Sequence, residues 1–211
     1  MYRAALSFSF MMIFFISSAQ FTGYKPVSDA SAFKQVFTAA SLKITSVKCD
    51  FMQEKNLSML SEKMISRGKF WYKKPGLLRM EYLQPFQYLM IFNKTDVLIK
   101  DGDKENKISS KSNKLFGQIN DIMVDCIRGT VLQNPDFNTS AFEGKQDFLI
   151  ELSPTAKNLK EYFKSIQLKV DKKDFSAISI EMIEQSGDNT IIHFTNKELN
   201  AIIPNSIFNI H

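Results

Sequence analysis

Histidine, the side chain that most often performs acid–base chemistry near neutral pH, is sparse in this sequence. Its two histidines are His193, inside a predicted strand, and His211, the last residue. A catalytic triad or a zinc site needs several such groups at defined spacing, and two isolated histidines do not provide it. Carboxylates such as Asp50, Glu81 and Glu181 alternate with apolar residues, which places them on the solvated face of their strands. We therefore expect no enzyme activity, no metal and no cofactor.

A different chemistry, the binding of an apolar ligand, is indicated by residues 67–86 and the segments beside them. Aromatic, leucine and methionine side chains alternate with charged ones on both sides of a Pro75–Gly76 turn, which predicts a hairpin with one apolar and one charged face. Methionine suits a surface that adapts to its ligand. The alternative is an ordinary core, because apolar alternation usually reflects packing. The expected apolar wall consists of Phe51, Phe70, Tyr72, Leu78, Met80, Tyr82, Met90 and Phe92.

Two amphipathic helices are predicted to cover this wall. The first begins near Ser28 or Asp29, either of which can cap it, and the second ends at Gly129. Both carry apolar residues at helical spacing, with polar residues on the opposite side. The side chains expected to face the wall as a lid are Phe33, Phe37, Phe116, Ile119, Ile122 and Met123.

The remaining periodic segments are short and alternate with period two, as antiparallel strands do. Beyond the hairpin, strands are expected around 47–52, 90–92, 97–99, 148–152, 166–170, 178–182, 191–195 and 206–208. About ten to eleven strands and two helices predict an α+β, mainly antiparallel fold. We expect a curved, incomplete β-barrel that is covered by a helical lid and encloses a hydrophobic cavity.

The N-terminus is typical of a secretory signal peptide. Arg3 precedes an apolar run over residues 4–16, and Ser17, Ser18 and Ala19 supply small residues for cleavage. The run has 13 residues, fewer than the roughly 20 that span a bilayer. We predict removal of residues 1–19 and export of a single domain over residues 20–211. Lipid attachment to the new N-terminus is not expected, because no cysteine lies near it.

Composition excludes one further class of function. After residue 19 the chain has 26 basic and 22 acidic residues, spread along its length, whereas nucleic-acid binding usually requires a clustered basic face.

The two cysteines, Cys49 and Cys126, are too far apart in sequence for a CxxC motif. In an exported protein they could form a disulfide. Alternatively they remain free, because both fall on the predicted apolar faces of their elements, where a free cysteine packs as a small hydrophobic residue.

Four segments resemble the periplasmic outer-membrane lipoprotein carrier proteins (LolA-like). In chain order they are CDFMQEK, SRGKFWYKKPGLLRMEY, LSPTAKNLKEYFKSIQLKVD and IEQSGDNTIIHFTNKELNAIIPNSIF, which is also their order in that family. The resemblance implies an incomplete β-barrel with a helical lid over a hydrophobic cavity. It also implies a periplasmic, non-enzymatic chaperone that shields the acyl chains of lipoproteins and moves them from the inner to the outer membrane.

The partners implied by this resemblance are acylated lipoproteins, an inner-membrane lipoprotein-release transporter and an outer-membrane acceptor, each membrane complex being contacted transiently. A shuttle of this kind works naturally as a monomer. The alternative is a carrier or sensor for another lipid, glycolipid or apolar ligand with the same fold.

Lys74 is the one residue to which the resemblance gives a gating role. It occupies the position of an arginine that is implicated in lid closure and cargo release in the enteric carriers. Lysine lacks the planar fork of arginine, and its charge is concentrated on a single ammonium group. The alternative is that Lys73 and Lys74 are solvated turn residues.

Overall fold

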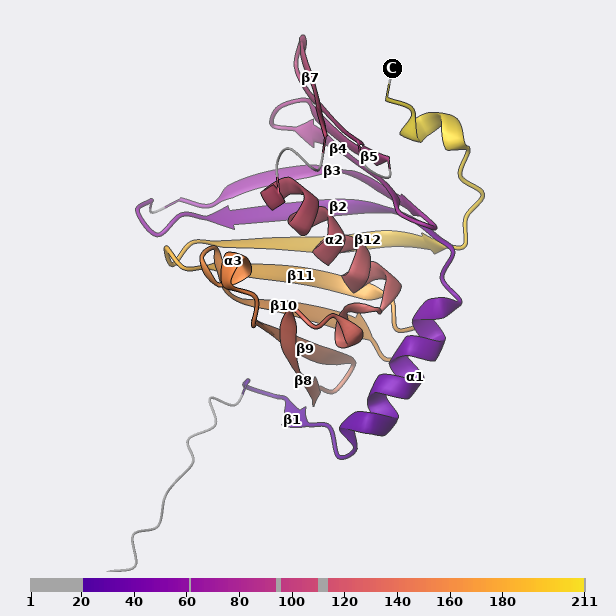
Figure 1. Ribbon diagram of the computed structural model, residues 1–211, viewed down its shortest axis with the longest axis vertical. Helices are drawn as coiled ribbons and strands as arrows, with labels where there is room; N and C mark the ends of the chain where they lie inside the picture. The colour runs from indigo at the N-terminus through magenta and orange to yellow at the C-terminus, as the bar shows by residue number, and fades with distance from the viewer. Residues whose placement is uncertain (1–20, 61, 94–95, 110–113, 211) are drawn as a thin grey trace, which may run out of the picture.

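Twelve antiparallel strands form one strongly curved sheet in the described part of the chain (Figure 1). The computed structural model describes residues 21–60, 62–93, 96–109 and 114–210, so the predicted signal peptide lies outside it. The strands neighbour one another in the order β1-β8-β9-β10-β11-β12-β2-β3-β4-β5-β6-β7. They are β1 (Lys25–Pro26), β2 (Ser46–Asn56), β3 (Met64–Lys73), β4 (Leu77–Gln84), β5 (Tyr88–Asn93), β6 (Asp96–Asp101), β7 (Lys104–Ser109), β8 (Phe137–Glu143), β9 (Asp147–Pro154), β10 (Phe163–Asp171), β11 (Ala177–Glu184) and β12 (Asn189–Leu199).

Two longer helices cover the concave side of this sheet. The helical segments are α1 (Ala30–Leu42), α2 (Lys114–Arg128), the short α3 (Lys157–Lys160) and the 3₁₀ turns η1 (Val131–Gln133) and η2 (Asn205–Phe208). In Figure 1, α2 lies across β2, β12 and β11, and α1 runs along the ends of the strands. Asp29 caps α1 by accepting the Ala32 N–H at 2.9 Å, and α2 ends at Gly129, whose φ of +67° favours glycine.

The main core lies between the concave face and the helices. Side chains of β9, β10 and β11 alternate along each strand, and many of the inward ones are completely buried, as for Ile150, Leu168 and Ile180. Helix α1 contributes Phe37, and η1 contributes Val131, both fully buried. The alternation predicted from the sequence is therefore observed: one face of the sheet is buried and the other is more exposed.

A second, smaller core lies on the outer face of β3 to β6, under the C-terminal segment 200–210. Lys73 Nζ donates to the Ile203 carbonyl and to Asn205 Oδ1, each at 2.7 Å, and Arg79 Nη1 donates to the Ile207 carbonyl at 3.1 Å. The apolar members of this outer core are Trp71, Leu77, Leu89, Ile91, Leu98, Ala201, Ile203, Ile207, Phe208 and Ile210. The outer face of the hairpin, predicted to be charged, is thus charged only in part.

The predicted fold class is confirmed, with three differences in its elements. The sheet has twelve strands rather than ten or eleven, because β1, β7 and β8 carry little apolar alternation in the sequence and were not predicted. Residues 206–208, expected as a strand, form the 3₁₀ turn η2, since Pro204 directs the chain across the outer face instead of into the sheet. A third helix, α3, adds a single turn before β10.

Candidate apolar ligand site

All eight residues of the predicted apolar wall lie on β2 to β5 and share the concave face. Strand register arranges them in rows across the sheet, for example Phe70, Met80 and Met90, which are directly opposite one another on β3, β4 and β5. Six of the eight are at most 4% exposed, and Tyr82 and Met90 are half-buried. The alternation in the sequence therefore placed these side chains on the correct face.

Gly68 of β3 has a specific packing role in the apolar wall. It lies opposite Phe51 in the register, and a Cβ at this position would be 2.7 Å from a ring carbon of Phe51 and 2.0 Å from the Glu81 carbonyl oxygen. The absence of a side chain lets the Phe51 ring lie flat on the β3 backbone. From there the ring packs edge-on against Tyr82, with centroids 4.9 Å apart.

A cavity of about 160 Å³ lies between the wall and α2. An apolar cavity of about 150 Å³ in another protein accepts one benzene molecule, so this space holds roughly six carbon atoms. The lining residues are Gln53, Leu78, Met80, Tyr82, Met90, Phe92, Ile119, Met123, Met182 and Ile192. Five members of the predicted wall and two of the predicted lid therefore surround one cavity.

Two polar groups of this lining, the Tyr82 hydroxyl and the Gln53 side-chain oxygen, are hydrogen-bonded to each other. The Tyr82 hydroxyl donates to Gln53 Oε1 at 2.9 Å. Burial raises the pKa of Tyr82 well above its usual range, so the hydroxyl stays neutral. The cavity consequently presents methionine, leucine, isoleucine and aromatic surface, which suits an alkyl chain.

The other three wall residues support the cavity rather than line it. Phe51 packs on Tyr82, and Phe70 packs against Phe194 of β12 with ring centroids 5.3 Å apart. The hydroxyl of Tyr72 is buried without a hydrogen-bond partner among the described residues, and burial raises its pKa to about 12. Three lining residues, Gln53, Met182 and Ile192, were not predicted from the sequence, although alternation along β2, β11 and β12 assigns all three to the same inner face.

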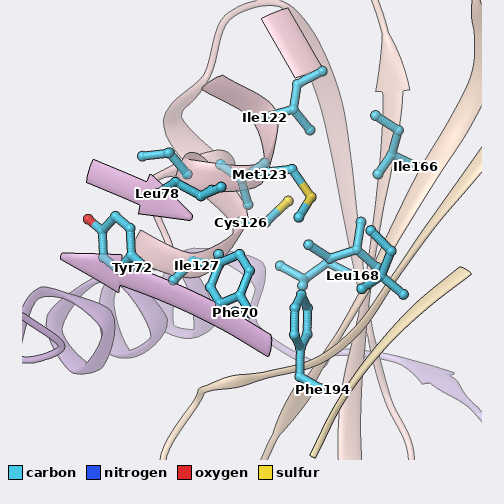
Figure 2. Packing of buried hydrophobic residues seen from close by; sticks show 14 of the residues in the cluster. Phe70, Tyr72, Leu78, Ile122, Met123, Cys126, Ile127, Ile166, Leu168 and Phe194 are labelled. Carbon is cyan, nitrogen blue, oxygen red and sulfur yellow. The ribbon is translucent and has the colours of Figure 1, made fainter. Parts of the chain in front are cut away.

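The predicted lid residues divide into two groups. Ile119 and Met123 of α2 face the cavity, and Figure 2 shows Met123, Cys126 and Ile127 directed into the core beside Phe70. Ile122 lies beside them on the same helix and is 4% exposed. The side chain of Phe116 lies outside the described part of the structure.

The two lid residues of α1 lie away from the cavity. Phe33 stacks on Phe37 at a centroid distance of 5.8 Å and contacts Phe148 of β9 at 4.8 Å, while Phe37 also contacts Phe175. These rings pack α1 onto the β9 side of the sheet. Among the described residues, the part of the lid that covers the cavity is α2.

Lys74 connects the β3–β4 turn to the lid. Its Nζ donates to the carbonyl of Leu42, in the last turn of α1, at 2.7 Å, and we call this hydrogen bond the lid contact. Arg128, in the last turn of α2, donates to the Pro75 carbonyl of the same turn at 3.4 Å. Burial, and to a lesser extent the charge of Arg128, lower the pKa of Lys74. Neither Lys73 nor Lys74 is merely solvated, because both ammonium groups are hydrogen-bonded to other elements.

The candidate acid–base groups do not converge. Glu81 pairs with Arg79 at 2.9 Å on the outer face, and His193 Nε2 lies 3.7 Å from Glu54 Oε1 on a partly exposed surface. Asp50 accepts a hydrogen bond from Asn196 at 2.8 Å, which lowers the pKa of its carboxyl. In residues 21–60, 62–93, 96–109 and 114–210, no group of three His, Cys, Asp or Glu side chains could hold a metal ion.

The two cysteines are free and buried, so the disulfide considered above is absent from the structure. Burial raises the pKa of Cys49 to about 12 and that of Cys126 still further, which keeps both thiols protonated and unreactive. Cys126 packs with the inner side chains of α2 (Figure 2).

In the part of the chain that the structure describes, no helix is both long enough and apolar enough to span a membrane.

Comparison with known proteins identifies the family. The family model of the outer membrane lipoprotein carrier protein LolA matches residues 42–211. This chain belongs to the LolA family. The match includes the whole wall, the lid contact and α2. Among curated proteins, none matches the sequence.

Several solved structures are similar to this chain at low sequence identity. MucB is 14% identical with a TM-score of 0.52, and the match covers 88% of this chain and 64% of MucB. An uncharacterized conserved protein from Thermus thermophilus is 8% identical with a TM-score of 0.50, covering 87% of this chain and 95% of that one. A LolA superfamily protein from Nitrosomonas europaea is 12% identical with a TM-score of 0.48, covering 84% and 97%.

Proposed function

We propose that this LolA-family protein is a periplasmic carrier that shields the acyl chains of lipoproteins and moves them from the inner to the outer membrane. The observation that carries the proposal is the apolar cavity between the wall and α2. The protein reaches the periplasm through the signal peptide over residues 1–19 and works as a single domain over residues 20–211. It performs no enzymatic step, since transfer requires only that acyl chains enter and leave.

The cavity volume indicates that the lid moves during this cycle. Burial is worth ~0.8 kcal/mol per methylene, so the roughly six carbons that fit the closed cavity contribute about 5 kcal/mol. Complete burial of three long acyl chains would contribute tens of kcal/mol, above the roughly 21 kcal/mol at which noncovalent affinity saturates. Cargo must therefore displace α2, and the energy needed for this displacement lowers the net affinity enough for release.

Lys74 is the proposed gate. The lid contact and the hydrogen bond from Arg128 to Pro75 join the last turns of α1 and α2 to the same β3–β4 turn. A cation at a helix C-terminus also interacts favourably with the helix dipole. Breaking these two contacts frees the ends of both helices without disturbing the sheet.

The proposed partners follow from this cycle. An inner-membrane lipoprotein-release transporter loads the carrier, and an outer-membrane acceptor unloads it, each through a transient contact. The carrier acts as a monomer.

Native mass spectrometry of the protein purified from its own periplasm tests the proposal. A bound triacylated polypeptide is the expected result. A bound free glycolipid instead would show that the protein carries a different cargo. A photoreactive residue at Met90, in the cavity lining, should crosslink to the acyl chains, whereas one at the exposed Thr195 should not. Equal crosslinking from both positions, or no bound lipid of any kind, would overturn the proposal.

A further inference from the structure

Strand β12 contains a β-bulge that changes the direction of one lysine. Between Thr195 and Glu198 it has one residue more than β2 has between their partners Asp50 and Lys48. Asn196 adopts a φ of +52°, and its side chain donates to Asp50 Oδ2 at 2.8 Å, which fixes the bulge. Bulges commonly redirect a side chain relative to the strand pattern.

The redirected residue is Lys197, whose ammonium group lies at one end of the interior. Its Nζ donates to Ser176 Oγ at 2.6 Å and to the Ala177 carbonyl at 3.1 Å. Both acceptors are neutral, and among the described residues no carboxylate lies within 4.0 Å of this Nζ. An ammonium group has three donors, so one remains available. A partly buried cation without an anionic partner is unfavourable in an apolar setting, which makes an anion a suitable ligand.

Apolar side chains surround this ammonium group. Lys197 shares the lining of a small cavity, about 10 Å³ and thus large enough for about one water molecule, with buried residues of β2, β3, β12 and α2. The charge of Lys197 also acts on the concave face: burial raises the pKa of the Cys49 thiol, and the positive charge of Lys197 lowers it in part. The residues that line the small cavity are Ile44, Val47, Phe70, Ile127, Ser176, Ala177, Phe194 and Lys197.

The small cavity and the larger, 160 Å³ cavity are neighbours. On β12, Phe194 lines the small one, and Ile192, two residues earlier on the same face, lines the larger one. On the hairpin, Phe70 lines the small one, and its register partner Met80 lines the larger one. Phe70 and Phe194, which form an edge-to-face pair and are labelled in Figure 2, therefore lie at the boundary between the two cavities.

We propose that Lys197 and Ser176 bind the anionic head of a single-chain amphiphile, such as a fatty acid, whose chain passes Phe70 and Phe194 into the larger cavity. This ligand differs in class from the uncharged acyl chains of a lipoprotein. From residue 192 to residue 197 the strand spans at most about 16 Å, at about 3.3 Å per residue. A twelve-carbon chain has eleven carbon–carbon bonds of about 1.5 Å, which in a zigzag span about 14 Å, so it reaches from Lys197 to the larger cavity. About six of its carbons fill that cavity, and the remainder requires the Phe70 and Phe194 rings to move apart.

Displacement of an apolar fluorescent probe, 1-N-phenylnaphthylamine, tests this assignment. Dodecanoate, the neutral monododecanoylglycerol and the cationic dodecylamine have the same chain length and differ in the charge of the head. We expect dodecanoate to bind about tenfold more tightly than monododecanoylglycerol, as a charge-assisted hydrogen bond allows, and dodecylamine to bind most weakly. Equal affinities for the three ligands would overturn the proposal.

Variants of the lysine localise the effect. Lys197→Met should abolish the preference for dodecanoate, and Lys197→Arg should keep it. Lys48→Met is the matched control, because Lys48 lies on the neighbouring strand but pairs with Glu198 on the outer face at 2.8 Å. A preference that survives Lys197→Met would also overturn the assignment. If Lys197→Met does not fold, the relative affinities of the three ligands for the unmodified protein still test the proposal. Binding of triacylated lipoprotein should be unchanged in Lys197→Met, so this test is separate from that of the proposed function.

Discussion

The substitution Met80→Glu tests whether the wall encloses a ligand cavity or an ordinary core. Met80 is 4% exposed, and it lines the 160 Å³ cavity opposite Met90. Losing the burial of a methionine costs about 1.5–3 kcal/mol. An unpaired buried carboxylate costs more, but the cavity has room for about five water molecules at roughly 30 Å³ each, which hydrate the carboxylate. We expect the free energy of unfolding to fall by about 2–4 kcal/mol, which a protein with a typical stability of about 5–15 kcal/mol survives.

At neutral pH the Met80→Glu variant should bind no acyl ligand, because a chain would displace the water that hydrates the charge. Urea denaturation and displacement of a fluorescent apolar probe measure the two effects. Desolvation raises the pKa of the introduced carboxyl, and the neutral form tolerates a chain, so binding should recover as the pH falls through that raised pKa.

Two further variants make the test of Met80 decisive. Met80→Gln has nearly the same shape without the charge and should retain weak binding. Leu168→Glu places a carboxylate at a fully buried position that lines neither of the two interior cavities, and it should prevent folding. The cavity interpretation is refuted if Met80→Glu destabilises the protein as much as Leu168→Glu does, or if it binds acyl ligands as tightly as the unmodified protein at neutral pH.

Three other substitutions test the lid and the outer core. Lys74→Ala removes the lid contact, which as a surface interaction is worth about 0.5–1 kcal/mol, and should accelerate uptake of a fluorescent apolar probe severalfold; an unchanged rate would exclude Lys74 as a gate. Gly129→Ala places a Cβ 1.9 Å from Ser41 Oγ at a φ of +67°, so the melting temperature should fall by about 5 °C or more, and a normal melt would contradict the packing of α1 on α2. Phe208→Ala should detach segment 200–210 before the sheet unfolds, which the red-shifted emission of Trp71, the sole tryptophan, would report.

Alternation explains why so much of the wall could be predicted. A strand that is half-buried repeats with period two, and residues 67–86 follow that period on both sides of the turn. The helices were equally readable, because Asp29 and Gly129 mark their ends with a cap and a left-handed residue. In such segments the local signal and the tertiary packing agree.

The misses occur where packing at long range decides the structure. The outer core could not be placed, because Trp71 and Ile91 are covered by a segment more than a hundred residues later in the chain. A signal was present in the continuous apolar residues 89–92, since strands buried on both faces lose their alternation. The direction of Lys197 depends on one extra residue in β12, and that residue becomes evident only when β12 is paired with β2.

The linear strand order, from β1 at one edge to β7 at the other, determines how the interior can change size. In a closed barrel the diameter follows from the number and stagger of the strands, so expansion would require broken ladder hydrogen bonds. Here the curvature is distributed over eleven strand pairs, and a small rotation at each one widens the interior while every pair stays intact. Ligands of different size can therefore be accommodated without a change in the register of any strand pair. The cavity volume of the ligand-free protein is a lower limit on the volume of ligand that the interior can hold.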